Sequence, residues 1–245
     1  MHRVVHRYGP DEQQHVALWP AEPGPARGTI VLVHGGYWRA RFTADLMLPL
    51  VAPLRDRGWA VANVEYRRVG TGGGWPATVE DAGAAFDLVR GKAPGPVVLV
   101  GHSVGGQLAL LHAARADAVV ALAPVTDLVR GFAEGIGEDA VIDFMGTTPE
   151  EDPAAYAAAS PIASTPLRPV LVVHGADDAR VPVAHARDYV ERARAAGAAI
   201  TMHEHPELSH LALIDPAAAH WAGVHDWLSA EGCRRRPARG GVSKE

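Results

Sequence analysis

A serine between two glycines is the first feature of this sequence that could do chemistry. The motif Gly-His-Ser-Val-Gly at residues 101–105 follows an apolar run and precedes a helical pattern. A strand, a sharp turn and a helix in this order expose the serine hydroxyl and point the free N–H groups of the helix toward developing negative charge. Glycines suit such a turn because it crowds neighbouring side chains. We therefore expect Ser103 to be a nucleophile.

A serine nucleophile needs a histidine to take its proton and a carboxylate to orient that histidine. Behind a turn of this kind the expected chain order is serine, acid, histidine. Of the late histidines, His203 and His205 lie on or at the end of an expected strand, whereas His210 lies in the loop before the last helix. We expect His210 to be the base.

Three aspartates follow expected strands and could orient the base. Asp177 and Asp178 lie in the loop after the apolar run at 169–175, and Asp127 follows the preceding strand. Ligands of open parallel sheets bind beyond the carboxyl ends of the strands, so all three lie on the relevant edge. The residue pattern alone leaves the choice open.

Acyl transfer also needs backbone N–H groups that bind the developing oxyanion. One donor is expected from Val104, the residue after the nucleophile, and the second from the loop after an earlier strand. That loop begins His34-Gly35-Gly36-Tyr37-Trp38. We expect the donors at Gly36 and Tyr37, with Gly35 permitting the turn.

Aromatic residues near these loops are candidates for binding substrate. Trp75 lies in the glycine-rich loop at 67–78, which follows another expected strand. With Trp38 and Tyr37 it could form an aromatic wall for an aryl or small acyl group. Alternatively, Trp75-Pro76 only pins a flexible loop.

The elements that must position these residues alternate along the chain. Near-continuous apolar runs are typical of strands covered on both faces, and helical patterns between them indicate βαβ units. We predict an α/β fold with a doubly wound, mostly parallel sheet. Strands are expected at 29–36, 60–67, 96–103, 118–124, 169–175 and 198–205, and helices at 44–57, 77–90, 105–116, 184–196 and 216–230.

Three segments depart from this alternation. Residues 126–165 are long for one crossover and predict a small helical insertion or lid. About the first 25 residues could add antiparallel strands at one edge of the sheet. The basic, glycine-rich residues 232–245 lack apolar periodicity and predict a disordered tail after a single domain at 1–231.

Together these residues resemble an α/β-hydrolase from about residue 29 to residue 228. G-x-S-x-G, D-x-x-V-P and a late loop histidine occur in the family's order. H-G-G-x-W resembles the oxyanion loop of kynurenine formamidases (arylformamidases), and it also occurs in esterases. The resemblance implies Ser103, Asp178 and His210 as the triad, with Asp127 as the alternative acid. It implies cleavage of a small ester or aryl amide, by a carboxylesterase or an arylformamidase.

Composition limits the other function classes. The 245 residues carry a net charge of −5, 48% are hydrophobic, and no apolar run reaches the length of a membrane helix. We expect a cytoplasmic enzyme with a small-molecule substrate, no nucleic-acid or membrane partner, no cofactor and no metal, and a homodimer is possible from base rates. The alternative function is a non-catalytic α/β-hydrolase that binds a small ligand. A metal site of late histidines with Asp177 and Asp178 would leave the serine turn unexplained.

Overall fold

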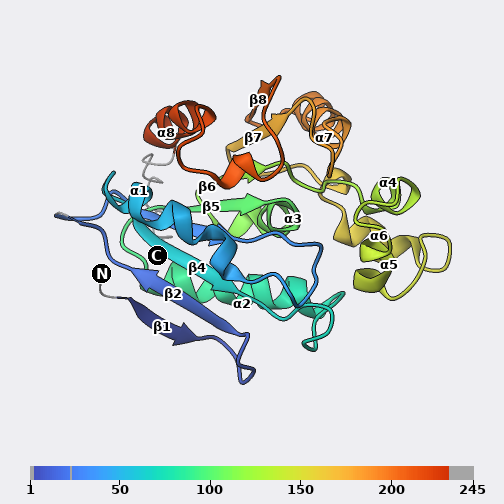
Figure 1. Ribbon diagram of the computed structural model, residues 1–245, viewed down its shortest axis with the longest axis horizontal. Coiled ribbons are helices and arrows are strands. Elements are labelled where there is room, and N and C mark those ends of the chain that lie inside the picture. Colours follow the sequence, from blue (N-terminus) through green and yellow to red (C-terminus); the bar gives the residue numbers. More distant parts are fainter. Residues whose placement is uncertain (1–2, 23, 232–245) are drawn as a thin grey trace, which may run out of the picture.

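The protein is built around one eight-stranded sheet in the order β1-β2-β4-β3-β5-β6-β7-β8 (Figure 1). The computed structural model describes residues 3–22 and 24–231, so the expected tail at 232–245 lies outside the described residues. The strands are β1 (Val4–Arg7), β2 (His15–Trp19), β3 (Thr29–Val33), β4 (Ala60–Glu65), β5 (Val97–His102), β6 (Ala118–Leu122), β7 (Val170–Gly175) and β8 (Ile200–His205).

Pairing in this sheet confirms the predicted mostly parallel topology. β3 to β8 pair in parallel, while β1 and β2 are antiparallel and extend the edge beside β4. Every residue of β3, β4, β5 and β6 is buried, which explains their continuous apolar sequence. The expected edge strands in the first 25 residues are therefore present.

Helices cover both faces of the sheet. One core cluster joins the sheet to α2 (Ala77–Lys92), α3 (Val104–Leu111) and α7 (Ala184–Ala195). A second cluster joins the opposite face to α1 (Val51–Arg55) and α8 (His220–Ala230). Short 3-10 turns complete the helical elements: η1 (Ala44–Leu50), η2 (Ala113–Arg115), η3 (Pro161–Ala163) and η4 (Ala212–Ile214).

Three expected helices are shorter than the sequence pattern suggested. The helix expected at 105–116 ends as α3 at Leu111 and is followed by the 3-10 turn η2. The pattern at 44–57 is divided into the 3-10 turn η1 and the five-residue helix α1. Pro49 and Pro53 lie inside this segment, and proline has no N–H for the helical hydrogen-bond ladder. The last helix begins at His220 rather than at residue 216, after a turn in which Ala217 N–H donates to Asp215 (2.9 Å).

The segment between β6 and β7 contains three short helices, α4 (Leu128–Ala133), α5 (Ala140–Met145) and α6 (Pro153–Ala159), followed by η3. They pack together at one end of the sheet (Figure 1) and share a third core cluster with Trp38 and Val104. This helical segment therefore contacts the loop after β3 and the start of α3, the two places where the sequence predicts oxyanion donors.

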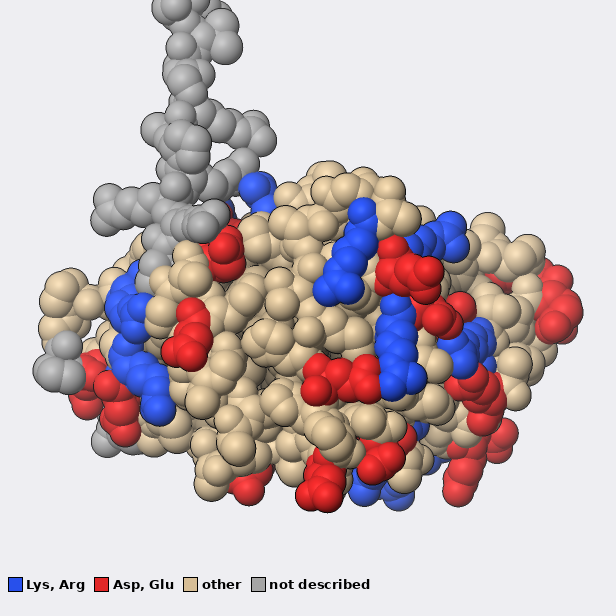
Figure 2. Space-filling view, turned by 90° about the horizontal axis from the view of Figure 1, so that it is seen from above, with Lys and Arg blue, Asp and Glu red and all other residues tan. Residues whose placement is uncertain are grey.

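Seen from above, the surface carries acidic and basic side chains next to one another (Figure 2). Ion pairs explain part of this pattern: Arg187 on α7 pairs with Glu204 on β8, and Arg130 on α4 pairs with Asp188. Among the described residues, no helix is both long and apolar enough to cross a membrane.

Candidate active site

Ser103 lies at the sharp turn between β5 and α3. Its backbone has φ 58° and ψ −120°, a conformation that L-residues rarely adopt, and its N–H donates to the Leu122 carbonyl (2.8 Å). A Cβ on Gly101 would lie 2.2 Å from the Gly105 carbonyl oxygen, and one on Gly105 would lie 2.2 Å from the Val33 oxygen. The two glycines are therefore required by close backbone packing around the serine.

His210 and Asp178 form a buried hydrogen-bonded pair beside this turn. The imidazole Nδ1 donates to Asp178 Oδ2 (2.7 Å), so Nε2 is the ring nitrogen left for proton transfer. The other carboxylate oxygen, Oδ1, accepts from the N–H groups of Arg180 (2.8 Å) and Val181 (3.0 Å). Each oxygen of Asp178 thus has a donor, and the carboxylate is held in one orientation.

These contacts also determine the charge of Asp178. Burial alone would raise the pKa of its carboxyl group, but the hydrogen bond and charge of His210 and the two backbone donors together lower it below its usual value. Asp178 is therefore ionised at neutral pH, as a carboxylate that orients an imidazole must be.

The other aspartates considered in the sequence have different positions. Asp127 begins α4, where its side chain accepts from the Arg130 N–H (3.0 Å), so it serves as an N-cap. Asp177 is exposed, and neither residue hydrogen-bonds to His210 within the described part of the chain. The geometry favours Asp178 as the partner of His210.

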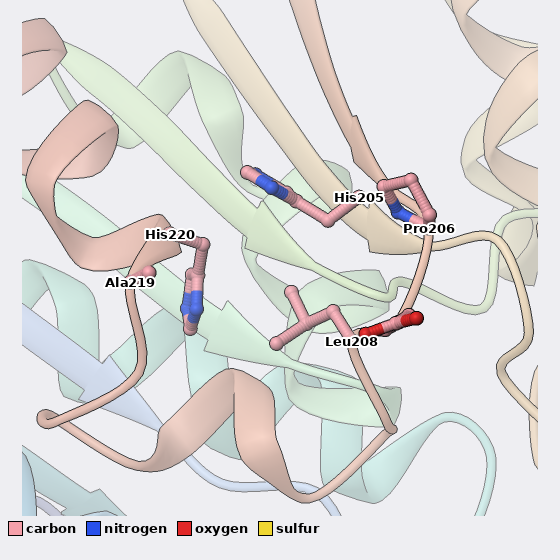
Figure 3. Close-up of a pocket in the computed structure, with 6 residues that line it drawn as sticks. His205, Pro206, Leu208, Ala219 and His220 are labelled. Carbon is pink, nitrogen blue, oxygen red and sulfur yellow. The ribbon is translucent and has the colours of Figure 1, made fainter.

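His203 and His205 lie on β8, away from the serine. His205 lines a separate cavity of about 470 Å³ with Pro206, Leu208 and His220, whose ring lies 6.0 Å from that of His205 (Figure 3). The structure thus separates His205 from the cavity that contains Ser103, as the sequence interpretation expected for a strand-end histidine.

His102, next to the serine, supports the loop that carries the base. Its Nε2 donates to the backbone carbonyl of His210 (2.9 Å), and the two rings lie 4.6 Å apart. Burial, and then the nearby His210, lower the pKa of His102 to about 3. The ring is therefore neutral at physiological pH and keeps its proton on Nε2.

The loop after β3 has the backbone expected of an oxyanion loop. Gly36, Tyr37 and Trp38 have φ values of 117°, 57° and 55°. A Cβ on Gly36 would lie 2.2 Å from Cβ of Phe42, so only glycine fits there. Among the described residues, the N–H groups of Gly36, Tyr37 and Val104 donate to no protein acceptor. Gly36 and Tyr37 line the cavity that contains Ser103, whereas Val104 has no exposed surface and is not part of that lining.

A buried charged network holds this loop. His34 Nδ1 lies 2.7 Å from the Gly35 carbonyl oxygen, and His34 Nε2 lies 3.0 Å from Glu65 Oε1. Glu65 also accepts from Arg68 and from the Ala44 N–H. The peptide between Gly35 and Gly36 is trans, so fixing its carbonyl toward His34 points the Gly36 N–H the opposite way. The motif histidine thus orients a candidate oxyanion donor.

One cavity of about 300 Å³ brings the candidate residues together. Four of its lining residues, Gly36, Tyr37, Ser103 and His210, were expected from the sequence. Arg41 and Arg180 were not expected there, because Arg41 lies outside any motif and Arg180 occupies a variable position of D-x-x-V-P. The complete lining is Gly36, Tyr37, Arg41, Phe42, Leu46, His102, Ser103, Arg180, His210 and Leu211.

The expected aromatic wall of Trp38 and Trp75 does not line this cavity. Trp38 has no exposed surface: its Nε1 donates to Gln107 (3.0 Å) and its ring stacks on Phe144 at 4.4 Å. Trp75 packs in the same cluster, and its N–H donates to the Phe144 carbonyl (2.8 Å). Both indoles fasten loops to the helical segment, while Tyr37 and Phe42 are the aromatic residues at the cavity.

Comparison with known proteins identifies relatives of this chain. The sequence model of the family described as BD-FAE matches residues 18–192. Esterase LipC of Mycobacterium tuberculosis is 28% identical over an alignment of 235 residues, which covers 79% of this chain and 56% of LipC. The chain therefore spans about half the length of the curated relatives it matches.

Solved structures share the fold. A truncated carbohydrate esterase from gut microbiota superposes with a TM-score of 0.82 at 20% identity, over 94% of this chain and 95% of that one. Esterase 2 of Thermogutta terrifontis gives a TM-score of 0.73 at 22% identity, over 98% and 95% of the two chains. These matches and the sheet topology establish the α/β-hydrolase fold.

Proposed function

The chain belongs to the BD-FAE family, and from this premise and the geometry of the site we propose that it is a serine esterase acting on small esters. The observation that carries the proposal is the pair of His210 and Asp178, joined at 2.7 Å, with His210 lining the same cavity as Ser103. A non-catalytic binder has no need of an oriented imidazole beside a strained serine.

The proposed reaction follows from the position of each group. Ser103 Oγ attacks the ester carbonyl carbon while His210 Nε2 takes its proton, and Asp178 stabilises the resulting imidazolium. The carbonyl oxygen becomes an oxyanion that accepts hydrogen bonds from the N–H groups of Gly36, Tyr37 and Val104. His210 then returns the proton to the leaving alcohol, and an acyl-Ser103 ester remains.

Water completes the proposed cycle. With the alcohol gone, His210 Nε2 removes a proton from a water molecule, whose oxygen attacks the acyl carbon. The second tetrahedral intermediate collapses, the proton passes to Ser103 Oγ, and the carboxylic acid leaves. His210 carries the proton in every transfer of this cycle.

An ester is a better-supported substrate than the aryl formamide that H-G-G-x-W suggested. The relatives and neighbours named above are described as esterases. A cavity of about 300 Å³ lies at the small end of the range for ligand sites, which favours a short acyl group. We propose that the protein is a carboxylesterase. Its turnover of an ester should be compared with its turnover of N-formylkynurenine, an aryl formamide.

Turnover of p-nitrophenyl acetate and labelling by a fluorophosphonate probe test this proposal. The purified protein should hydrolyse the ester and be labelled at Ser103. Ser103→Ala should lose both properties and keep its thermal unfolding transition. Absence of labelling and turnover in the unsubstituted protein would instead favour the non-catalytic binder.

A matched pair of substitutions tests the acid. Asp178→Asn should lower kcat by roughly 10³- to 10⁴-fold, because the amide no longer holds the imidazole in the required tautomer. Asp127→Asn should keep full activity, since asparagine caps a helix as well as aspartate does. The opposite ranking of these two variants would assign the acid to Asp127.

A further inference from the structure

Two arginines line the cavity that contains Ser103. Arg41 lies just after the loop that carries Gly36 and Tyr37, and Arg180 lies two residues after Asp178. Their loops follow β3 and β7, which lie on opposite sides of β5 in the sheet. The two arginines therefore belong to loops on different sides of the strand that leads to the serine.

Neither guanidinium group is neutralised by the protein. Among the described residues, Arg41 and Arg180 form no ion pair with a carboxylate, and the Arg41 guanidinium lies over the Phe42 ring at 4.9 Å. Eight of the fifteen other arginines in the described part of the chain form ion pairs with acidic side chains. The paired ones are Arg39, Arg55, Arg67, Arg68, Arg90, Arg115, Arg130 and Arg187.

The cavity wall contains no acidic residue that could offset these charges. Asp178 is the nearby carboxylate, but its side chain is fully buried and both oxygens already accept hydrogen bonds. Both Asp178 and Arg180 influence the pKa of His102: the carboxylate raises it, and the guanidinium lowers it by a smaller amount. The charged side chains that line the cavity are both cationic, in a chain whose net charge is −5.

We propose that Arg41 and Arg180 select esters that carry a carboxylate on the acyl or the alcohol part. This inference rests on the proposed esterase function and specifies its substrate class. Guanidinium groups bind carboxylates through paired, charge-assisted hydrogen bonds, and they stay ionised at any pH at which the enzyme works. An anionic substituent would occupy the place that acidic side chains fill at the paired arginines.

Matched pairs of anionic and neutral esters test the proposal. On the acyl side, p-nitrophenyl hemisuccinate is compared with p-nitrophenyl pentanoate, and on the alcohol side 4-acetoxybenzoate is compared with 4-acetoxybenzamide. The ratio of kcat/KM for the anionic over the neutral ester should exceed one in at least one pair. Arg41→Gln and Arg180→Gln should each reduce that ratio by about 10-fold.

Arg192→Gln is the matched control. Arg192 also lacks a carboxylate partner among the described residues, but it lines a different cavity with Tyr189 and Thr165. This substitution should leave the ratio as it is in the unsubstituted protein. Added salt should reduce the ratio, because exposed charges are screened within about 10 Å at 0.1 M ionic strength.

Calorimetry separates this inference from the proposed esterase function, because it needs no turnover. Benzoate should bind more tightly than benzamide, and the double variant of Arg41→Gln and Arg180→Gln should abolish the difference. Equal binding of the two ligands, or ratios at or below one in both ester pairs, would overturn the inference. Absence of ester turnover with selective benzoate binding would refute only the esterase function.

Discussion

Ser103 has a positive φ, and the residues two positions before and after it, Gly101 and Gly105, have no side chains. The strain at φ 58° persists because its N–H bonds to Leu122 and because the first turn of α3 packs onto the carbonyls of Val33 and His34. The contact depends on Gly105, which allows the helix to approach the end of β3. At the scale of single residues, the position of Ser103 at the cavity depends on the absence of a Cβ two positions away.

Gly105→Ala tests this dependence. Its Cβ would lie 2.2 Å from the Val33 oxygen and 2.4 Å from the His34 oxygen, so we expect destabilisation by about 2 kcal/mol and loss of esterase activity. Gly91→Ala is the control, since a Cβ at Gly91 in α2 meets nothing within 4 Å. That variant should be slightly stabilised, by about 0.5 kcal/mol. Equal melting temperatures for the two variants would refute the packing argument.

At the scale of elements, the oxyanion loop is held from two sides. Toward the sheet, His34 and Glu65 fix the Gly35 carbonyl. Toward the helical segment, Trp38 bonds to Gln107, whose Nε2 donates to the Ala159 carbonyl of α6 (2.8 Å). The helices between β6 and β7 therefore hold the loop in place as well as covering the cavity end of the sheet.

Glu65→Gln tests the support from the sheet. Removing this charge leaves Arg68 buried without its carboxylate, and breaking a buried pair typically costs about 3 kcal/mol. We expect that loss in denaturant unfolding, together with a lower kcat for p-nitrophenyl acetate. Glu204→Gln removes the exposed partner of Arg187 and should change neither quantity measurably. A Glu65→Gln enzyme with full kcat would show that the loop needs no such support.

For the whole molecule, buried histidines link stability to pH. Burial, complete or partial, lowers the pKa of seven histidines: His102, His112, His174, His185, His205, His220 and His225. Each is neutral in the folded protein but takes up a proton in the unfolded chain below its ordinary pKa of 6.5. The unfolded state then binds more protons, so stability falls as the pH drops below 6.5. For His102 this loss continues until its folded pKa of about 3.

The lowered pKa of Asp178 also makes the folded protein less stable as the pH falls, but at lower pH than the histidines do. Its carboxylate contributes stability above the ordinary pKa of 3.8, and this contribution is lost as the pH falls through the lower folded value. The histidine effect therefore begins first on acidification, and the carboxylate effect follows.

Urea unfolding at two pH values tests this linkage. Between about pH 7.5 and about pH 5, His102 alone should account for a loss of about 2 kcal/mol in the free energy of unfolding. His102→Gln should reduce the pH-dependent loss by that amount. His6→Gln, on the outermost strand β1, is the control and should retain the full dependence. If the free energy of unfolding depends on pH in the same way in the unsubstituted protein, in His102→Gln and in His6→Gln, the loss does not come from His102.

The sequence alone predicted the doubly wound, mostly parallel sheet, and it proposed Ser103 and His210 as site residues. Parallel strands buried on both faces are continuous apolar runs, so β3 to β7 could be recognised from neighbouring residues. The serine turn is also a local pattern, and chain order indicated His210. The boundaries of the helix at 44–57 failed because two prolines outweighed the apolar periodicity.

Only the tertiary structure distinguished residues that share a local pattern. Asp127, Asp177 and Asp178 all follow strands, but the crossovers bring Asp178 alone within reach of His210, 32 positions along the chain. Trp38 was expected at the cavity, yet its partner is Gln107, 69 positions away. Neither Arg41 nor Arg180 occupies a fixed position of a motif, and they line the cavity of Ser103 because their loops leave the same edge of the sheet. Local sequence determines elements and turns, whereas contacts between distant residues depend on how the elements pack.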